Sequence, residues 1–385
     1  MLTGIFIAII AIAIVLMTRS ITVLIHELGH AIPSLLFTKK EVIICVGSYE
    51  NLTKSKGIKL GRLTTFFTFN IFNWNSGLCL HKGVTTFIQN FLIILGGPLA
   101  SLLIGLGMIY IVKNWQGGQY GVVVAVFLIV SALWDFISNI IPHDKPLVTH
   151  NGNIVYNDGF QLKRLLQQNS LAPNQQEALS EYNRGYYDKV LTLLKSDAIE
   201  GLQTTDVQRI YVESLMHTRQ LAKAEETFYH YFGQTELKSP DFSLIAEIKM
   251  EQKQYENALQ AYDRAVYLDF TNPLLHDKKG LCHTNLADYE EAVVAFSKGI
   301  IHNPDFYQSM VNRAYALIKL ERLDLAKRDL NFAIALNQEY PKAYFCLGLL
   351  KKELGDKQEA LTYLLKAQSM GFEHHGLDYY IAQVS

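Results

Sequence analysis

The sequence predicts a mainly α-helical protein in two parts: a polytopic membrane core of about three spans with a short β segment, then an α-solenoid of helical repeats. Long apolar blocks fill the chain up to about residue 160, and beyond it the composition becomes that of a soluble helical protein. From residue 171 onward, apolar positions recur with a period of 34 residues, which is typical of stacked helix–turn–helix units. We therefore expect a membrane domain over residues 1–168 and a repeat domain over residues 171–385.

Three apolar segments are expected to span the membrane, at about residues 3–37, 86–112 and 120–141. A continuous helix from Leu2 to Phe37 would measure about 54 Å, against a hydrocarbon core of about 30 Å. Either the helix breaks near Thr18-Arg19-Ser20 or one end projects beyond the bilayer, and we expect the second. The segment lacks the basic start and the cleavage pattern of a signal peptide, so we expect it to stay attached.

The charge of the connections predicts the orientation. The connection over residues 38–83 carries seven Lys and Arg residues against two Glu, whereas the turn between the second and third spans has only Lys113 at its edge. By the positive-inside rule the first connection is cytoplasmic, which places the N-terminus outside and the repeat domain inside. The arrangement suggests an integral protein of a bacterial inner (plasma) membrane.

A short β segment is expected within residues 41–82, at the membrane face. Residues 42–47 and 65–72 have the composition of strands and are separated by Gly and Lys turn material. Two interpretations stay open. The sheet is either an interfacial cover over the helices or an edge on which an extended peptide segment pairs.

The most specific motif is His26-Glu27-Leu28-Gly29-His30, which lies in the first apolar segment. On a helix its two histidines lie one turn apart on one face and bind a single zinc ion, with Glu27 beside the bound water as general base. Ionisable groups at mid-membrane cost about 2.5–3.5 kcal/mol each. Zinc binding of about 10–16 kcal/mol is large enough to offset that cost. The motif indicates a zinc site inside a membrane, and the alternative is a chance match on a packed helix.

Three later motifs complete a family pattern: Gly96-Gly97-Pro98-Leu99-Ala100-Ser101, Asn139-Ile140-Ile141-Pro142 and Asn157-Asp158-Gly159. With the HExxH motif they resemble the site-2 protease family of intramembrane zinc metalloproteases over roughly residues 20–165. The resemblance implies His26, His30 and Asp158 as zinc ligands and Glu27 as the catalytic base. It also implies that Asn139 is a polar group facing the substrate or the surroundings of the metal.

Other residues compete for the third ligand position. Asp135 lies within the third span, where a carboxylate is costly and therefore needs a function. It could be a ligand, a partner that orients a histidine, or a water-facing group near the helix end. His143, Asp144 and His150 lie in the following loop without a spacing partner, which is typical of solvated surface groups. We rank Asp158 first and Asp135 second. Gly97, Ser101 and Gly105 lie at four-residue spacing and predict a face of close helix packing.

The second half of the chain resembles tetratricopeptide repeats, clearly over about residues 239–374 and in degraded form over 171–238, with residues 373–385 as a cap. Two sets of residues recur at the 34-residue period and are expected to form the core. The sets are Val190, Ala224, Ala258, Ala292, Ala326 and Ala360, and Leu194, Phe228, Tyr262, Phe296, Leu330 and Leu364. Gly280 and Gly348 are expected to open first helices of their units. The resemblance implies a protein or peptide partner on the concave surface.

The expected function is that of an intramembrane zinc metalloprotease with Zn²⁺ as cofactor, cutting a peptide bond in or near a transmembrane segment of a membrane protein substrate. The repeats would recruit substrate or a regulator. The alternatives are a non-proteolytic membrane-anchored repeat scaffold with a structural or relic zinc site, and a metal-handling membrane protein. No basic block with interleaved aromatics points to nucleic acid, and four scattered cysteines without CxxC spacing predict reduced thiols.

Overall fold

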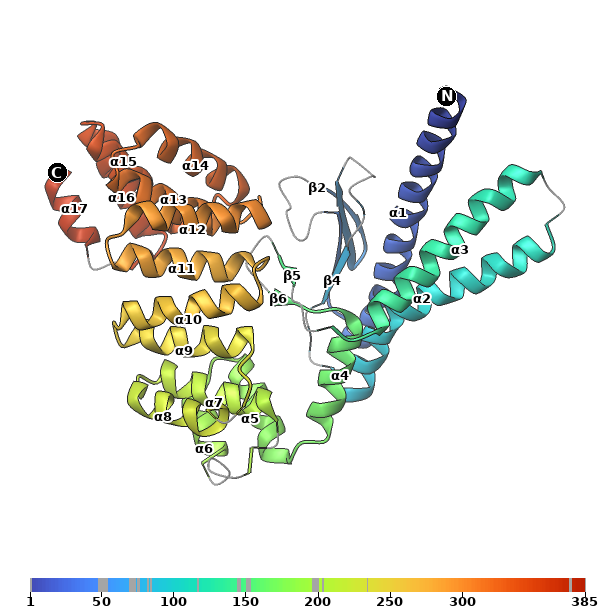
Figure 1. Ribbon diagram of the computed structural model, residues 1–385, viewed down its shortest axis with the longest axis horizontal. Helices are drawn as coiled ribbons and strands as arrows, with labels where there is room; N and C mark the ends of the chain where they lie inside the picture. Colours follow the sequence, from blue (N-terminus) through green and yellow to red (C-terminus); the bar gives the residue numbers. More distant parts are fainter. Residues whose placement is uncertain are drawn as a thin grey trace. The chain divides into compact units, whose positions relative to one another are not determined.

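The computed structural model divides the chain into two compact units, which are described separately (Figure 1). The first unit is Met1–Thr149 with Ile154–Ser170, and the second is His150–Asn153 with Leu171–Ser385. The structure describes residues 2–47, 55–68, 74, 77–81, 83, 85–115, 118–143, 147–149, 154–195, 201–202, 204–233, 235–373 and 376–384, with side chains from residue 10 onward except that of residue 147. Apolar membrane-type helices, a small sheet and a helical repeat region confirm the predicted fold class.

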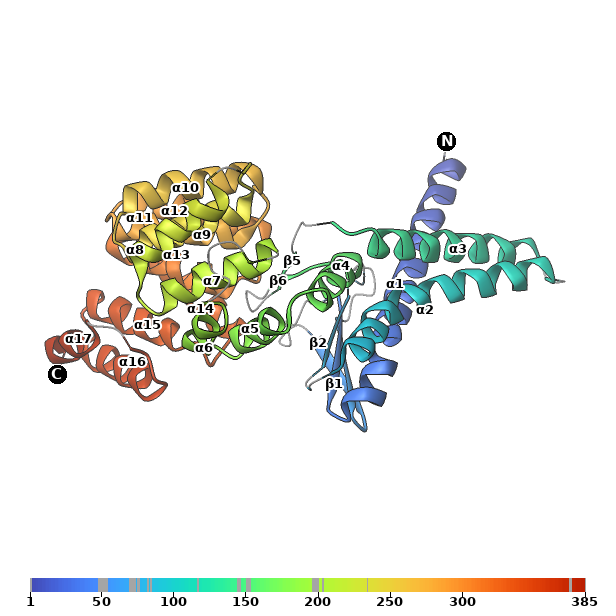
Figure 2. The ribbon, with the colours of Figure 1, turned by 90° about the horizontal axis from the view of Figure 1, so that it is seen from below.

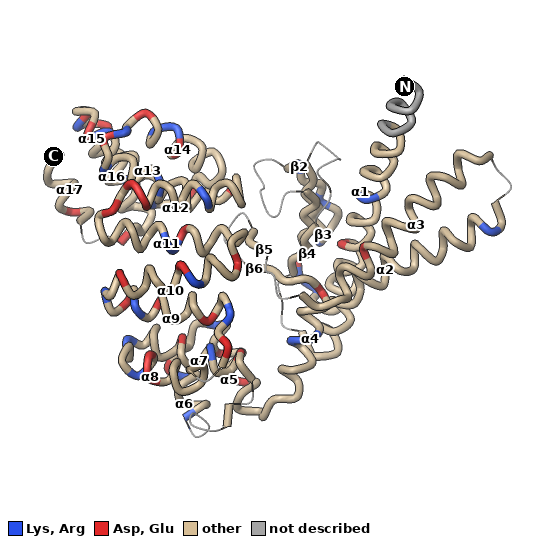
Figure 3. Tube along the Cα trace, in the orientation of Figure 1, with Lys and Arg blue, Asp and Glu red and all other residues tan. Residues whose placement is uncertain are grey.

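Three long apolar helices build the first unit: α1 (Leu2–Thr38), α2 (Phe87–Lys113) and α3 (Gln119–Ile140). Within the described residues, each is long and apolar enough to cross a membrane, in α1 from Ile10 onward. Figures 1 and 2 show α2 and α3 side by side, with α1 crossing them. In Figure 3 the charged residues lie mainly on the repeat helices, and α2 and α3 carry one each, Lys113 and Asp135.

Helix α1 does not break at Thr18-Arg19-Ser20, so the expected continuous helix is confirmed. The hydroxyls of Thr18 and Ser20 donate to the carbonyls of Ile14 and Leu16, one turn earlier. These polar side chains are therefore satisfied by the helix itself and leave its backbone ladder intact.

Two glycines let α1 and α2 touch through their backbones. A Cβ on Gly29 would lie 2.7 Å from the Cβ of Ala100 and 2.8 Å from the carbonyl carbon of Gly96. A Cβ on Gly96 would lie 3.0 Å from the carbonyl carbon of Gly29. Because real Cβ atoms do not come this close to backbone, both positions require glycine. This crossing brings the α2 backbone directly against the HExxH turn of α1.

A four-stranded sheet connects α1 and α2, in the order β2-β3-β1-β4. β1 pairs parallel with β3 and antiparallel with β4, and β2 pairs antiparallel with β3. The strands are β1 (Val42–Val46), β2 (Ser55–Leu60), β3 (Leu63–Thr68) and β4 (Gly77–His81). Two strands were expected near β1 and β3, although residues 69–72 of the second lie outside the described residues. Residues expected to be turn material form β2 instead, and β4 was not expected.

A hairpin of two short antiparallel strands, β5 (Leu147–Val148) and β6 (Ile154–Val155), follows α3 and leads to α4 (Asp158–Asn169). The Asn157 side-chain amide donates to the Ile141 carbonyl at 2.7 Å, so the chain returns to the end of α3 after the hairpin. This geometry explains how Asp158 stays close to α3 although a long loop separates it from Pro142.

The second unit is a row of antiparallel helix pairs with a final short helix. Its helices are α5 (Pro173–Asn183), α6 (Tyr187–Leu193), α7 (Thr205–His217), α8 (Leu221–Phe232), α9 (Ser239–Glu251), α10 (Tyr255–Leu268), α11 (Pro273–Asn285), α12 (Tyr289–His302), α13 (Tyr307–Lys319), α14 (Leu323–Leu336), α15 (Pro341–Glu353), α16 (Lys357–Ser369) and α17 (Leu377–Val384). All residues of the two predicted core sets are buried. Gly280 and Gly348 do not open helices. They lie inside α11 and α15, where a Cβ on Gly280 would meet the Phe296 ring at 2.5 Å.

The turn between the paired helices needs a left-handed residue at a fixed position in each repeat. Arg219, Lys253, Ala287 and Glu321 all have φ of about 60°, and Gly355 takes this position in the last pair with φ 82°. Only glycine adopts this conformation without strain. None of the four cysteines, all of which the structure describes, is in a disulfide.

One carboxylate of the repeat unit is buried among hydrogen-bond donors. Asp277 accepts from the Ser309 hydroxyl at 2.6 Å and from the Asn312 amide at 2.9 Å. Burial raises the pKa of the Asp277 carboxyl, and these hydrogen bonds and the nearby Lys342 offset that rise only in part. Asp277 is therefore easier to protonate in the folded repeats than in an unfolded chain.

Candidate metal centre in the membrane unit

Three donor atoms converge at the crossing of α1 and α2. His26 Nε2 lies 3.0 Å from Asp158 Oδ2 and 3.1 Å from His30 Nε2, and His30 Nε2 lies 3.4 Å from Asp158 Oδ2. All three residues are buried. Tetrahedral zinc with ligands at about 2.0–2.1 Å separates its donors by about 3.3 Å. The spacing and the chemistry of this donor set therefore fit a single zinc ion.

The hydrogen-bond partners of the two Nδ1 atoms show which ring nitrogen of each histidine carries a lone pair toward this centre. His30 Nδ1 lies 2.7 Å from the carbonyl oxygen of Ile93, and His26 Nδ1 lies 2.7 Å from an Asp135 carboxylate oxygen. Both partners accept, so each Nδ1 carries the proton and each neutral ring presents the lone pair of Nε2. Two such lone pairs 3.1 Å apart repel each other unless a cation lies between them. The histidines are thus arranged for metal binding.

Asp158 is held in place by the junction of α3 and α4. Asn157 caps α4 by accepting from the Phe160 backbone at 3.1 Å, and its amide donates to carbonyls at the end of α3. A Cβ on Gly159 would lie 2.6 Å from the Ile140 carbonyl carbon, so only glycine lets α4 start this close to α3. Asp158 is the first residue of α4, where the helix dipole favours a negative charge.

The charge state of Asp158 suits a metal ligand. Burial works to raise the pKa of its carboxyl, but the charge and hydrogen bonds of the protonated forms of His30 and His26 outweigh burial and hold this pKa at about 2. A metal cation bound in place of those protons would favour the carboxylate in the same way. The group is therefore a carboxylate, which is the form that binds a metal cation.

Gly97 leaves room for the donor cluster. A Cβ on Gly97 would lie 2.7 Å from His26 Nε2 and 2.5 Å from His30 Cε1. The bare backbone of α2 at Gly97 thus forms one wall of the donor cluster. The predicted face of close packing is confirmed at Gly97, Ser101 and Gly105, all of which are buried.

Glu27 lies between the metal centre and the sheet. It is buried, and its carboxyl group interacts electrostatically with His26, His30 and Asp158. A Cβ on Gly77 would lie 2.5 Å from Glu27 Cγ and 2.7 Å from Glu27 Cδ, so the backbone of β4 passes directly over this side chain. The acidic group of Glu27 is therefore close to both the donor cluster and a strand of the sheet.

The other predicted site residues occupy different places. Asp135 binds the far side of His26, so the structure separates it from the three converging donors. The Asn139 amide donates to the Asp135 backbone carbonyl at 3.0 Å, one turn earlier in α3, and its proposed contact with substrate stays a prediction. His143 is exposed, and Asp144 and His150 lie outside the described residues.

Three contacts of this centre were not predicted from the sequence: the ion pair of Arg19, the hydrogen bond of Ser101 to Asp135 and the capping of α4 by Asn157. Ser101 donates to Asp135 at 2.6 Å and lies 3.3 Å from His26 Nδ1. Arg19 pairs with Asp135 across two apolar helices. A charged residue in an apolar segment is a signal for function, and Arg19 carries this signal as Asp135 does.

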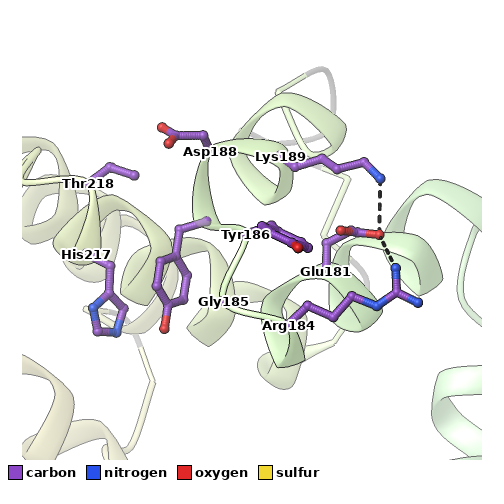
Figure 4. Close-up of a pocket in the computed structure, with 9 residues that line it drawn as sticks. Glu181, Arg184, Gly185, Tyr186, Asp188, Lys189, His217 and Thr218 are labelled. Carbon is purple, nitrogen blue, oxygen red and sulfur yellow. Dashed lines mark hydrogen bonds and ion pairs between the residues drawn. The ribbon is translucent and has the colours of Figure 1, made fainter.

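The repeat unit contains a separate polar hollow of about 710 Å³ between α5, α6 and the end of α7. Figure 4 shows Glu181 bridged to Lys189 and Arg184, with Thr218 and His217 on the opposite wall. The His217 ring stacks on Tyr187 with centroids 4.2 Å apart. Glu181 is paired with both Arg184 and Lys189, and the described lining residues do not resemble the donor cluster of the membrane unit.

The first unit is thus an apolar three-helix core with a buried cluster of two histidines and one carboxylate, and the second unit is a row of helical repeats. Comparison with known families agrees. A family described as Peptidase M50B-like matches residues 1–143, and the tetratricopeptide repeat family matches residues 242–272 and 341–370. These matches confirm both predicted resemblances. The peptidase match ends before Asp158.

Curated relatives match over a limited stretch. RNA polymerase II-associated protein 3 of Xenopus tropicalis is 34% identical over 95 residues, which are 25% of this chain and 14% of that protein. The human protein of the same name is 28% identical over 120 residues, 30% of this chain and 18% of that protein. The chain thus spans less than a fifth of the length of these relatives.

Solved structures with a similar fold include tetratricopeptide proteins. YrrB, described as having an unusual peptide-binding site, has a TM-score of 0.37 at 15% identity, covering 51% of this chain and 97% of that one. Pseudomonas aeruginosa pilF has a TM-score of 0.46 at 16% identity, covering 57% and 99%. The first repeat domain of Spaghetti (RPAP3), solved with an HSP90 peptide, has a TM-score of 0.28 at 26% identity, covering 30% and 92%.

Proposed function

We propose that this protein is an intramembrane zinc metallopeptidase that cuts a peptide bond in or near a transmembrane segment of another protein. The observation that supports the proposal most directly is the convergence of His26, His30 and Asp158 beside Glu27, in a unit built of apolar helices. A structural zinc site needs no base. The buried Glu27 therefore favours a hydrolytic zinc site over a purely structural one.

The chemistry follows from the roles of these side chains. Zinc at this centre would lower the pKa of a water ligand towards about 7 and polarise the scissile carbonyl. Glu27 accepts the proton of the attacking water and passes it to the departing amine. His26, His30 and Asp158 hold their donor atoms at fixed spacing, which the junction at Asn157 and the backbone of α2 maintain.

The edge strand β4 supports a mode of substrate binding. A substrate helix in lipid has its carbonyls hydrogen-bonded, so it must unwind before one of them can be attacked. Among the described strands, β4 has a neighbour on one side only, β1. An extended segment that pairs with the open side of β4 comes next to Glu27, because Gly77 packs on that side chain. Of the two interpretations of the sheet, the substrate edge is favoured.

The membrane orientation is part of the proposal. Positive residues dominate the connection between α1 and α2, and by the positive-inside rule this supports a cytoplasmic connection and sheet, an external N-terminus and cytoplasmic repeats. We place the protein in a bacterial inner membrane. The tetratricopeptide repeats imply a protein partner, and we propose that they recruit the substrate or a regulator.

The test is Glu27→Gln, with Glu41→Gln as the matched control. Glu41 is an exposed acidic residue of the same unit that pairs with Lys59 at 2.7 Å, away from the donor cluster. The membrane proteomes of cells carrying either variant are compared with that of the wild type. We expect a membrane protein to accumulate uncut only with Glu27→Gln, while that variant still binds zinc.

The scaffold alternative predicts the opposite pattern. In that case Glu27→Gln would behave as wild type, while deletion of residues 171–385 would abolish the phenotype. Such a result would refute the peptidase proposal.

A further inference from the structure

Two charged residues of the apolar helices meet each other in the bundle. Arg19 lies on α1 and Asp135 on α3, and they form an ion pair. The Asp135 side chain is only 2% exposed, and the Arg19 side chain is 26% exposed. Charged groups in such surroundings are costly and persist where they are paired and serve a function.

Both carboxylate oxygens of Asp135 are engaged. Oδ1 accepts from the Arg19 guanidinium, and Oδ2 accepts from the Ser101 hydroxyl at 2.6 Å and lies 2.7 Å from His26 Nδ1. The carboxylate thus joins three helices and touches a proposed zinc ligand on the side away from the metal.

We propose that Arg19 and Asp135 act as one positioning unit that orients His26 for metal binding. The proposal rests on the zinc site proposed above. Asp135 accepts a hydrogen bond from the Nδ1–H group of His26, which leaves the lone pair of Nε2 directed at His30 and Asp158. Arg19 supplies the positive charge without which this carboxylate would be an uncompensated ion among apolar helices.

The same two helices carry a matched control contact. Thr22 and Ser131 are hydrogen-bonded at 2.9 Å between α1 and α3. Thr22 lies between Arg19 and His26 along α1, but no described hydrogen bond links it to His26. A variant at Ser131 therefore removes a polar link between α1 and α3 without touching the zinc ligand.

The experiment measures the zinc affinity of the full-length protein in detergent by competition with a chromophoric chelator. We expect Arg19→Gln and Asp135→Asn each to weaken zinc binding about 10- to 100-fold. Arg19→Lys should retain most of the affinity, and Ser131→Ala should bind as wild type. Combining Arg19→Gln with Asp135→Asn should weaken binding no further than Asp135→Asn alone, because the two residues act through one contact.

A second readout separates positioning from general destabilisation. Cobalt(II) bound in place of zinc should show an altered visible spectrum in Asp135→Asn, since the orientation of His26 changes, and an unaltered one in Ser131→Ala. If Arg19→Gln is not recovered in folded form, Arg19→Lys is measured in its place. Zinc affinity that is retained in Arg19→Lys and weakened in Asp135→Asn then supports the ion pair.

Two results would overturn the inference. One is a folded Arg19→Gln protein that binds zinc as the wild type does, and the other is a Ser131→Ala protein that loses as much affinity as Asp135→Asn. If the wild type itself binds no zinc, the proposed function fails as well. If the wild type binds zinc and depends on Glu27 for cleavage while Arg19→Gln has no effect, only the inference fails.

Discussion

Replacing Gly97 by alanine should destroy metal binding by adding a single methyl group. That methyl would lie 2.7 Å from His26 Nε2 and 2.5 Å from His30 Cε1. To reach an ordinary contact of about 3.4 Å, the two rings must retreat by about 0.7 and 0.9 Å, whereas a metal site tolerates ligand displacements of about 0.2 Å. We expect zinc affinity to fall by at least about 100-fold, which corresponds to about 2.7 kcal/mol.

Gly107→Ala on the same helix is the matched control, because nothing lies within 4 Å of the position its Cβ would take. Alanine in a helix interior is favoured over glycine by about 0.5–1 kcal/mol, so this variant should fold at least as well as the wild type. The assay is equilibrium competition for zinc against a chelator, expressed per folded protein recovered by size exclusion. A Gly97→Ala protein that binds zinc with wild-type affinity would refute the assigned position of the centre.

Three further predictions concern other parts of the molecule. Asn157→Ala removes the cap that holds Asp158, and should cost about 1 kcal/mol of stability and weaken zinc binding in the same competition assay. Asp277 has a raised pKa in the folded repeats, so the stability it contributes is present at acidic pH and is lost as pH rises through the folded pKa. Urea unfolding followed by circular dichroism should therefore show Asp277→Asn with a higher free energy of unfolding at pH 7 and a weaker dependence on pH. By the same measurement, Gly355→Ala should lower the free energy of unfolding by about 1–2 kcal/mol, and Ala287→Gly, at the equivalent left-handed turn, should not lower it.

The parts of the fold that could be predicted are those coded by local sequence. The HExxH turn lies within five residues, and its two histidines face one way because a helix repeats every 3.6 residues. The repeat helices were visible because a small residue and a large one recur at fixed spacing, as Ala292 and Phe296 show. The three apolar helices likewise follow from length and hydropathy alone.

The unpredicted parts depend on contacts between residues distant in sequence. β2 is short and carries two lysines, so its sequence resembles a turn, and only its pairing with β3 makes it a strand. Arg19 and Asp135 are 116 residues apart, and Ser101 lies in the helix between them. The sequence left three roles open for Asp135: a ligand, a partner that orients a histidine, or a water-facing group. Its contact with the far side of His26 and its 2% exposed side chain favour the orienting role.

The most direct test of this account is the zinc content of purified full-length protein, measured by mass spectrometry for the wild type and for Asp158→Ala. We expect one zinc per chain in the wild type and a loss of most of that zinc when the Asp158 carboxylate is removed. Wild-type protein that stays free of metal after exposure to zinc, or an Asp158→Ala variant that retains a full equivalent at the same affinity, would contradict it.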